Sequence, residues 1–185
     1  MKALFLDRDG TLVVDKGYVH NPKEVELLRG VGEALKRALA ADYSLFMLTN
    51  QSGVGRGYYS LEDVYACNRY MERLLKLPKP LFLEVGVAPE VPDGPTLYRK
   101  PSPRFILEMI AKYGLDPKHC FMLGDRLSDI EAGMNAGIKG VGLATDPKIG
   151  LREKVKGLRG KESPPIFGDL PEFINALLNG DEVLK

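Results

Sequence analysis

Short apolar runs along the chain alternate with longer segments in which apolar residues recur at helical spacing. Nearly continuous apolar runs, typical of strands buried on both faces, cover 3–6, 44–48, 80–87, 119–123 and 139–143. Helical spacing predicts helices over 31–41, 61–76, 103–113, 127–136 and 170–178. This alternation predicts an α/β fold with three layers, Rossmann-like, around a mostly parallel central sheet.

Polar and glycine residues mark several boundaries of these elements. Ser60, with Asp63 three residues later, predicts the start of a helix, and Gly114 and Gly137 predict helix ends. The segment 144–165 is rich in Lys, Gly and Pro and receives no assignment. We expect residues 1–185 to form one domain, because this length suits a single hydrophobic core.

Composition excludes several classes of protein. Lys and Arg number 26 against 25 Asp and Glu, for a net charge of +1, so nucleic acid is not expected as a partner. Two cysteines, Cys67 and Cys120, are too few for a disulfide framework or a zinc motif. No apolar stretch approaches the roughly 20 residues of a membrane span, and no secretory signal is visible, so we expect a cytoplasmic protein.

The first candidate for chemistry is Asp7-Arg8-Asp9-Gly10-Thr11, at the end of the first predicted strand. Two carboxylates so close at a buried strand end repel each other unless a cation lies between them or one holds a proton. Oxygen ligands of this kind suit magnesium, which often shares its coordination shell with phosphate. Taken alone, the pattern fits a pair of turn-capping aspartates equally well.

Three further segments place polar residues at strand ends or in loops, and each is ambiguous alone. Thr49 and Asn50 could donate hydrogen bonds to phosphate oxygens, although such residues are also common in turns. Arg99 and Lys100 could neutralise phosphoryl charge, although solvated basic pairs are frequent. The fourth segment, 124–129, supplies a third carboxylate for a metal site, and its last residue fits the first turn of a helix equally well.

Taken together and in this order, the four segments resemble the signatures of the haloacid dehalogenase (HAD) superfamily over 4–143. Within it, the segment 49–57 and Arg99-Lys100-Pro101 are similar to the branch of histidinol phosphatase and heptose bisphosphate phosphatase. Polynucleotide 3′-phosphatase belongs to the same wider group. The resemblance implies a magnesium-dependent phosphatase that acts on a small phosphorylated metabolite, most of all a sugar bisphosphate such as heptose 1,7-bisphosphate.

The resemblance also implies a role for each matching residue. Asp7 would attack phosphorus and form an aspartyl phosphate, and Asp9 would act as general acid and then general base. Magnesium would be held by Asp7, by the main-chain carbonyl of Asp9 and by Asp125. The residues that would hold the phosphoryl group or the substrate are Thr49, Asn50, Arg99 and Lys100. The role of Asp129 is left open.

The spacing of the segments leaves no room for a large cap domain over the site. Residues 10–48 fit a flap and one helix, and residues 51–98 fit one helix, one strand and a loop. An open pocket is therefore expected. Arg56, with Tyr18, His20 and Asn21 from the first loop, is a candidate to contact the substrate.

One departure concerns the loop 86–98, which contains neither Cys nor His, whereas the two named phosphatases typically carry a zinc loop there. Zinc cannot organise this loop, and we expect its prolines to stiffen it instead. This departure weakens the transfer of either named phosphatase's substrate to this chain. Histidinol phosphate and a polynucleotide 3′-phosphate are the alternative substrates, the latter because the site is expected to be uncapped. A receiver-like domain phosphorylated on aspartate is the non-enzyme alternative, and a monomer is the default expectation.

Overall fold

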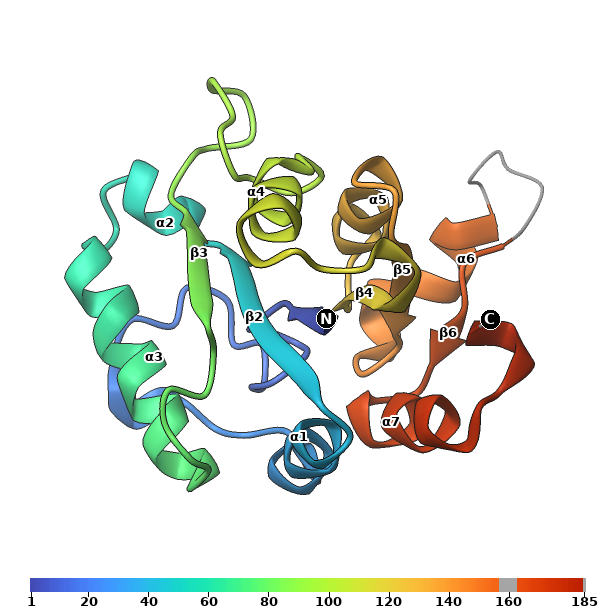
Figure 1. The fold of residues 1–185 in the computed structure, drawn as a ribbon. Helices are drawn as coiled ribbons and strands as arrows, with labels where there is room; N and C mark the ends of the chain where they lie inside the picture. Colours follow the sequence, from blue (N-terminus) through green and yellow to red (C-terminus); the bar gives the residue numbers. More distant parts are fainter. Residues whose placement is uncertain (157–162, 185) are drawn as a thin grey trace.

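The strands form one parallel sheet in which their order differs from their order in the chain (Figure 1). The computed structural model describes residues 1–156 and 163–184. Its strands are β1 (Lys2–Leu6), β2 (Tyr43–Asn50), β3 (Glu84–Ala88), β4 (Cys120–Gly124), β5 (Lys139–Leu143) and β6 (Ile166–Phe167). They lie in the order β3-β2-β1-β4-β5-β6, and every neighbouring pair is parallel.

Helices cover both faces of this sheet and complete the three predicted layers (Figure 1). They are α1 (Val31–Ala40), α2 (Ser52–Gly55), α3 (Leu61–Leu75), α4 (Arg104–Tyr113), α5 (Leu127–Asn135), α6 (Leu151–Lys156) and α7 (Leu170–Asn179). Four short 3₁₀ turns lie among the described residues: η1 (Pro22–Glu24), η2 (Pro117–His119), η3 (Pro147–Ile149) and η4 (Glu182–Leu184). The helices α1 and α7 pack on one face, and α4 and α5 pack on the other.

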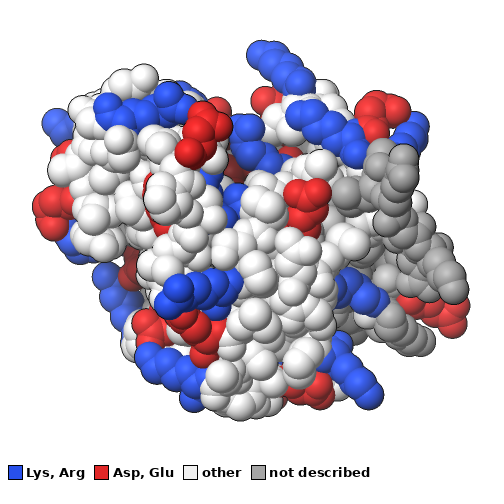
Figure 2. All heavy atoms as spheres, turned by 90° about the horizontal axis from the view of Figure 1, so that it is seen from above, with Lys and Arg blue, Asp and Glu red and all other residues white. Residues whose placement is uncertain are grey.

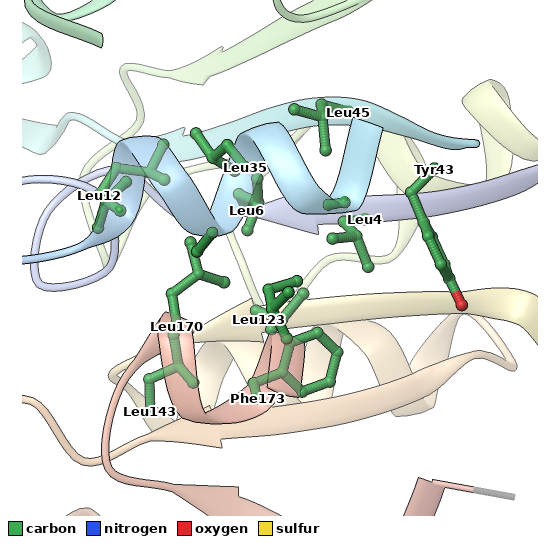
Figure 3. Packing of buried hydrophobic residues seen from close by; sticks show 14 of the residues in the cluster. Leu4, Leu6, Leu12, Leu35, Tyr43, Leu45, Leu123, Leu143, Leu170 and Phe173 are labelled. Atoms are coloured by element: carbon green, nitrogen blue, oxygen red, sulfur yellow. The ribbon is translucent and has the colours of Figure 1, made fainter. Parts of the chain in front are cut away.

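Successive residues of β1 enter opposite hydrophobic clusters, because side chains alternate along a strand. Leu4 and Leu6 pack with α1 and α7, as Figure 3 shows, whereas Ala3 and Phe5 pack with α4 and α5. All four side chains are fully buried. Burial of one such large side chain contributes about 1.5–3 kcal/mol, so β1 is anchored from both sides.

Most of the predicted elements are confirmed, with differences at two strands. Ser60 and Asp63 form a reciprocal capping box at the start of α3. The third strand begins at Glu84 and not at residue 80, since Leu81 and Phe82 are both buried in the same cluster and do not alternate between faces. The short strand β6 was not predicted. The unassigned segment 144–165 contains η3 and α6, and its part 157–162 lies outside the described residues.

The connections around the central strand agree with the absence of a large cap. Residues 7–42, all described, contain only η1 and α1, and residues 51–103 contain α2, α3 and β3.

Among the described residues, no helix is both long and apolar enough to cross a membrane. Basic and acidic side chains are interspersed on the face shown in Figure 2.

Candidate active site

The polar residues predicted to converge lie at the carboxyl ends of three adjacent strands. Asp7 follows β1, Asn50 ends β2 and Asp125 follows β4. The strands β2 and β4 flank β1: the chain runs from β1 through β2 to β3 on one side and then crosses back to β4 on the other side of β1. Open α/β sheets form clefts where the strand order reverses in this way. The backbone N–H of Asp7 donates to the carbonyl of Leu123 at 2.9 Å, which fixes the nucleophile candidate to β4.

A pocket of about 350 Å³ opens at this edge of the sheet. The residues that line it are Asp7, Asp9, Asp15, Gly17, Tyr18, Asn50, Gln51, Ser52, Tyr59, Arg99, Lys100, Arg126, Ser128 and Asp129. Thr49 and Asp125 are buried and do not line the pocket. Arg56 is exposed and lies outside the lining residues, so its contact with a substrate stays a prediction.

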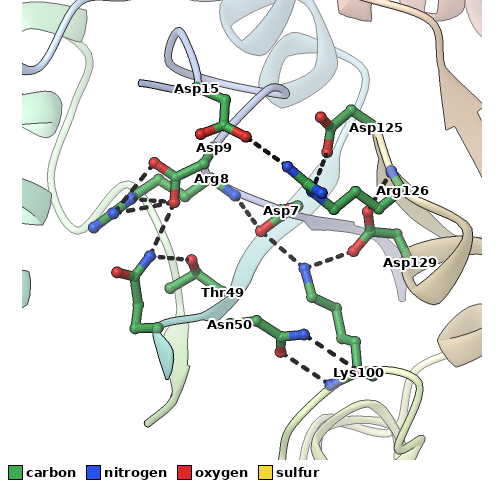
Figure 4. A network of polar contacts seen from close by, with 11 residues as sticks. Asp7, Arg8, Asp9, Asp15, Thr49, Asn50, Lys100, Asp125, Arg126 and Asp129 are labelled. Carbon is green, nitrogen blue, oxygen red and sulfur yellow. Dashed lines mark hydrogen bonds and ion pairs between the residues drawn. The ribbon is translucent and has the colours of Figure 1, made fainter. Parts of the chain in front are cut away.

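Lys100 lies between two carboxylates at the floor of this pocket (Figure 4). Its ammonium nitrogen lies 2.8 Å from Asp7 Oδ1 and 2.6 Å from Asp129 Oδ1, and only 3% of the residue is exposed. Burial alone would lower the pKa of Lys100, but the carboxylates of Asp129 and Asp7 outweigh burial and raise it. The lysine is therefore a permanent positive charge beside the nucleophile candidate.

Three buried carboxylates form a site that fits a divalent ion. Asp7, Asp125 and Asp129 each offer an oxygen, and these oxygens lie within 4.8 Å of one another. Both oxygens of Asp125 are buried and accept no hydrogen bond within the described part of the chain. Burial, followed by the charges of Asp7 and Asp129, raises the pKa of Asp125 to about 8. An ion with a preference for oxygen ligands, such as Mg²⁺, would satisfy these atoms.

Gly10 leaves space for the carboxylate of Asp125. Its backbone has φ +76°, which favours glycine, and a Cβ added there would lie 2.2 Å from Asp125 Oδ2. The Thr145 hydroxyl donates to the Gly10 carbonyl at 2.6 Å and holds this turn in place. The glycine of the first motif therefore keeps the backbone of the 7–11 turn against the third carboxylate.

The carboxylate of Asp9 points away from the three-acid cluster and is held by two neighbours. Arg8 donates from Nε to Oδ2 at 3.1 Å and from Nη2 to Oδ1 at 3.2 Å, and Gln51 Nε2 donates to Oδ2 at 2.9 Å. Burial raises the pKa of Asp9, the Arg8 charge opposes this rise, and Asp7 adds to it. A raised pKa suits a proton donor. Asp9 would then bind a metal ion only through its main-chain carbonyl, as the resemblance implies.

Asn50 has a structural partner that the sequence did not indicate. Its Nδ2 donates to the Lys100 carbonyl at 3.2 Å, and its Oδ1 accepts from the Lys100 N–H at 3.0 Å. We expected this amide to donate to a phosphoryl group. The structure adds the positioning of Lys100, and one N–H of the carboxamide remains for the pocket that Asn50 lines.

Gln51 links the second motif to the first, a role that the sequence analysis missed. Its Nε2 is 2.9 Å from Thr49 Oγ1 as well as from Asp9, and its Oε1 accepts from the Tyr59 hydroxyl at 2.9 Å. Gly53 makes room for that tyrosine, since a Cβ there would lie 2.2 Å from Tyr59 Cε1. The only signal was the position of Gln51 within the segment 49–57.

Two further pocket residues, Asp15 and Arg126, join loops that are distant in the sequence. Arg126 Nη2 lies 2.7 Å from Asp15 Oδ2 and connects the loop after β1 to the loop after β4 (Figure 4). Asp129 accepts the N–H of Arg126 at 2.9 Å, besides its contact with Lys100. The position left open by the sequence is thus a buried member of the site.

Comparisons with known proteins identify relatives of this chain. A model of the HAD-hydrolase-like family matches residues 97–154. The D-glycero-beta-D-manno-heptose-1,7-bisphosphate 7-phosphatase of Helicobacter pylori is 39% identical over an alignment of 145 residues, and the alignment covers 75% of this chain and 80% of that protein. The protein of the same name from Pasteurella multocida is 37% identical over an alignment of 183 residues, and the alignment covers 95% of this chain and 98% of that protein.

Solved structures show the same architecture. The D,D-heptose 1,7-bisphosphate phosphatase of B. bronchiseptica, in complex with magnesium and phosphate, aligns with a TM-score of 0.87 and 29% identity. The alignment covers 97% of this chain and 99% of that chain. A HAD-like phosphatase from Mesorhizobium loti aligns with a TM-score of 0.74 and 29% identity, over 100% of this chain and 87% of that chain.

Proposed function

Because this chain belongs to the HAD-like phosphatases, together with the heptose 1,7-bisphosphate 7-phosphatases that it matches, we propose that it removes one phosphate from a sugar bisphosphate of the heptose 1,7-bisphosphate type. The observation that carries the proposal is the junction of Asp7, Lys100 and the three-acid cluster at the floor of an open pocket. Two arginines, Arg99 and Arg126, also line this pocket and suit a substrate with a second anionic group.

In the first step, Asp7 attacks phosphorus. Its Oδ1 is occupied by the Arg8 N–H at 2.7 Å and by Lys100, so we assign the attack to Oδ2. The new bond joins Asp7 to phosphorus, and the bond from phosphorus to the ester oxygen breaks. Asp9 gives its proton to that leaving oxygen, which departs as the sugar hydroxyl.

In the second step, water hydrolyses the aspartyl phosphate. The Asp9 carboxylate takes a proton from the water as the water oxygen attacks phosphorus, and the bond from phosphorus to Asp7 breaks. Inorganic phosphate leaves and the Asp7 carboxylate is restored. Lys100 holds the phosphoryl oxygens throughout, and a contact from the buried hydroxyl of Thr49 stays a prediction.

The three-acid cluster is suited to magnesium in this reaction. Asp7, Asp125 and the main-chain carbonyl of Asp9 would hold the ion, and Asp129 would support the site through Lys100 and the Arg126 N–H. A bound Mg²⁺ supplies positive charge that offsets the repulsion between carboxylates and phosphate. The fit rests on the two buried oxygens of Asp125, which accept no hydrogen bond among the described residues.

A substrate panel tests the proposal. Purified protein is assayed with both anomers of heptose 1,7-bisphosphate, because the relatives' names include both, and with histidinol phosphate and a 3′-phosphorylated oligonucleotide. We expect kcat/KM for one heptose anomer to exceed that for the other two substrates by at least about 100-fold, and turnover to require magnesium. A preference for histidinol phosphate or the oligonucleotide would refute the substrate assignment.

A further inference from the structure

The loop 89–98, which lacks Cys and His, is closed by a single carboxylate. Glu90 Oε1 accepts the backbone N–H of Leu97 at 2.8 Å and that of Tyr98 at 3.0 Å. These bonds join the two ends of the loop across seven positions of the chain. Hydrogen bonds from backbone N–H groups to a carboxylate are stronger than those to a neutral acceptor, so one side chain can close a loop of this length.

Glu90 also contacts the pocket residue that follows the loop. Arg99 Nη1 donates to the main-chain carbonyl of Glu90 at 3.1 Å, and Arg99 lines the pocket. This is a hydrogen bond from the guanidinium to the loop's own backbone, so the position of the guanidinium depends on loop closure. The described contact uses Nη1 only, whereas an arginine carries five N–H donors, and the others can face a ligand.

The rest of the loop is anchored at its two ends. The Pro89 carbonyl accepts the N–H of Gly55 at 3.1 Å, which joins the loop to α2 beside the second motif. At the other end, the Ser102 hydroxyl donates to the Leu97 carbonyl at 2.9 Å. Between these anchors, the carboxylate of Glu90 is the side chain that links the ends to each other.

We propose that Glu90 is a positioning residue for substrate binding: its carboxylate closes the loop 89–98 and thereby holds Arg99 toward the pocket. This inference rests on the proposed function, since it assigns Arg99 a contact with the phosphorylated substrate. The remaining oxygen, Glu90 Oε2, is buried and accepts no hydrogen bond in the described residues. Loop closure therefore uses Oε1 alone, an atom that glutamine retains.

The test compares Glu90→Ala, Glu90→Gln and Arg99→Ala, with Asp93→Ala as the control. Asp93 is an exposed acid of the same loop. We expect Glu90→Ala and Arg99→Ala each to raise KM by about tenfold with kcat within about twofold of the parent. The double variant should do no worse than Arg99→Ala alone, because both changes remove the same contact. Glu90→Gln and Asp93→Ala should stay within about threefold of the parent.

Hydrogen exchange gives a measurement that does not depend on activity. The amides of Leu97 and Tyr98 should lose protection in Glu90→Ala and keep it in Glu90→Gln, with thermal unfolding measured alongside to confirm that each variant is folded. Unchanged protection in Glu90→Ala, or equal losses in both variants, would overturn loop closure by Oε1. Additive effects of Glu90→Ala and Arg99→Ala on KM would overturn the link to Arg99.

The same variants separate this inference from the proposed function. If heptose bisphosphates are poor substrates, the substrate assignment fails, and the KM comparison is made with whichever phosphate ester of the panel is turned over best. Exchange at Leu97 and Tyr98 is read in either case. Loss of protection together with non-additive effects on KM would then support the positioning of Arg99 by Glu90, with another phosphate ester as the substrate.

Discussion

The carboxamide of Asn50 pairs with the backbone of Lys100 through two hydrogen bonds. Asn50 Nδ2 donates to the Lys100 carbonyl at 3.2 Å, and the Lys100 N–H donates to Asn50 Oδ1 at 3.0 Å. Lys100 lies in the connection between β3 and α4, and Asn50 is the last residue of β2. A loop lysine is thus tied to the rigid end of a central strand. The pair fixes the backbone from which the four-carbon side chain of Lys100 reaches the carboxylates of Asp7 and Asp129.

The first prediction concerns this pair. Asn50→Ala should lower kcat by about 10- to 100-fold, because Lys100 would no longer be held beside the phosphoryl group. In a Lys100→Ala background the same change should have little further effect, since the two residues act as one unit. Steady-state kinetics of the two single variants and the double variant measure this. Independent effects would show that Asn50 acts on the substrate without Lys100.

The second prediction separates the roles of the paired aspartates. Asp7→Asn should abolish turnover and prevent any covalent phosphoenzyme. Asp9→Asn should slow hydrolysis of the intermediate, since the water is no longer deprotonated. With p-nitrophenyl phosphate, whose leaving group needs no proton, the phosphorylated form of Asp9→Asn should accumulate and be visible by mass spectrometry. Detection of a phosphoenzyme in Asp7→Asn would remove the assigned nucleophile.

The third prediction links Asp125 to stability and to metal. Its pKa is raised from an ordinary 3.8 to about 8, so the folded, metal-free protein keeps a proton that the unfolded chain loses in this range. Stability should therefore fall as pH rises from about 4 to about 8, by up to about 1.4 kcal/mol per pH unit. Thermal unfolding of Asp125→Asn in chelator should show a weaker dependence on pH.

Thermal unfolding in the presence of magnesium tests whether Asp125 binds the ion. At pH 8 the ion should raise the Tm of the parent protein, and this rise should be lost in Asp125→Asn. Asp116→Asn, which alters an exposed, hydrogen-bonded acid at η2 away from the pocket, serves as the control and should keep the rise. An equal response to magnesium in Asp125→Asn would place the ion elsewhere.

The fourth prediction concerns the acid–base residue. Arg8 lowers the pKa of Asp9 against the larger effect of burial, so Arg8→Met should raise that pKa further. Asp9 must be protonated to assist the leaving group, and this form is lost as pH rises through its pKa. The alkaline limb of kcat/KM for a sugar phosphate should therefore move to higher pH. For p-nitrophenyl phosphate this limb should be weak in both proteins. A limb that stays in place would assign it to another group.

Much of the fold could be predicted because its strands are buried on both faces. Their continuous apolar runs are easy to recognise, and the polar residues that follow β1, β2 and β4 indicated one shared edge. The strand β6 has two residues and follows Pro164 and Pro165, so no pattern could identify it. The prediction placed the start of β3 too early in the chain, because the buried residues of the preceding bend, such as Leu81, are as apolar as the residues of a buried strand.

The sequence predicted the charged residues of the site, but it did not predict the contacts that support them. Asp7 and Asp125 follow strands directly, so their positions follow from the sheet. The bridge between Asp15 and Arg126 joins residues 111 positions apart, and no local pattern carries such information. Glu90 was equally hidden, because nothing in the sequence distinguishes it from Asp93, the other acid of the same proline-rich loop.

The central place of β1, between β2 and β4, makes the site a late product of chain synthesis. A nascent chain that ends before residue 120 already holds Asp7, Asp9 and Lys100, yet the acids at 125 and 129 have not been made. Such a chain carries the nucleophile and Lys100 but lacks two of the three carboxylates of the metal site. Recovery of turnover during refolding therefore requires that β4 has docked on β1, which brings Asp125 and Asp129 beside Asp7.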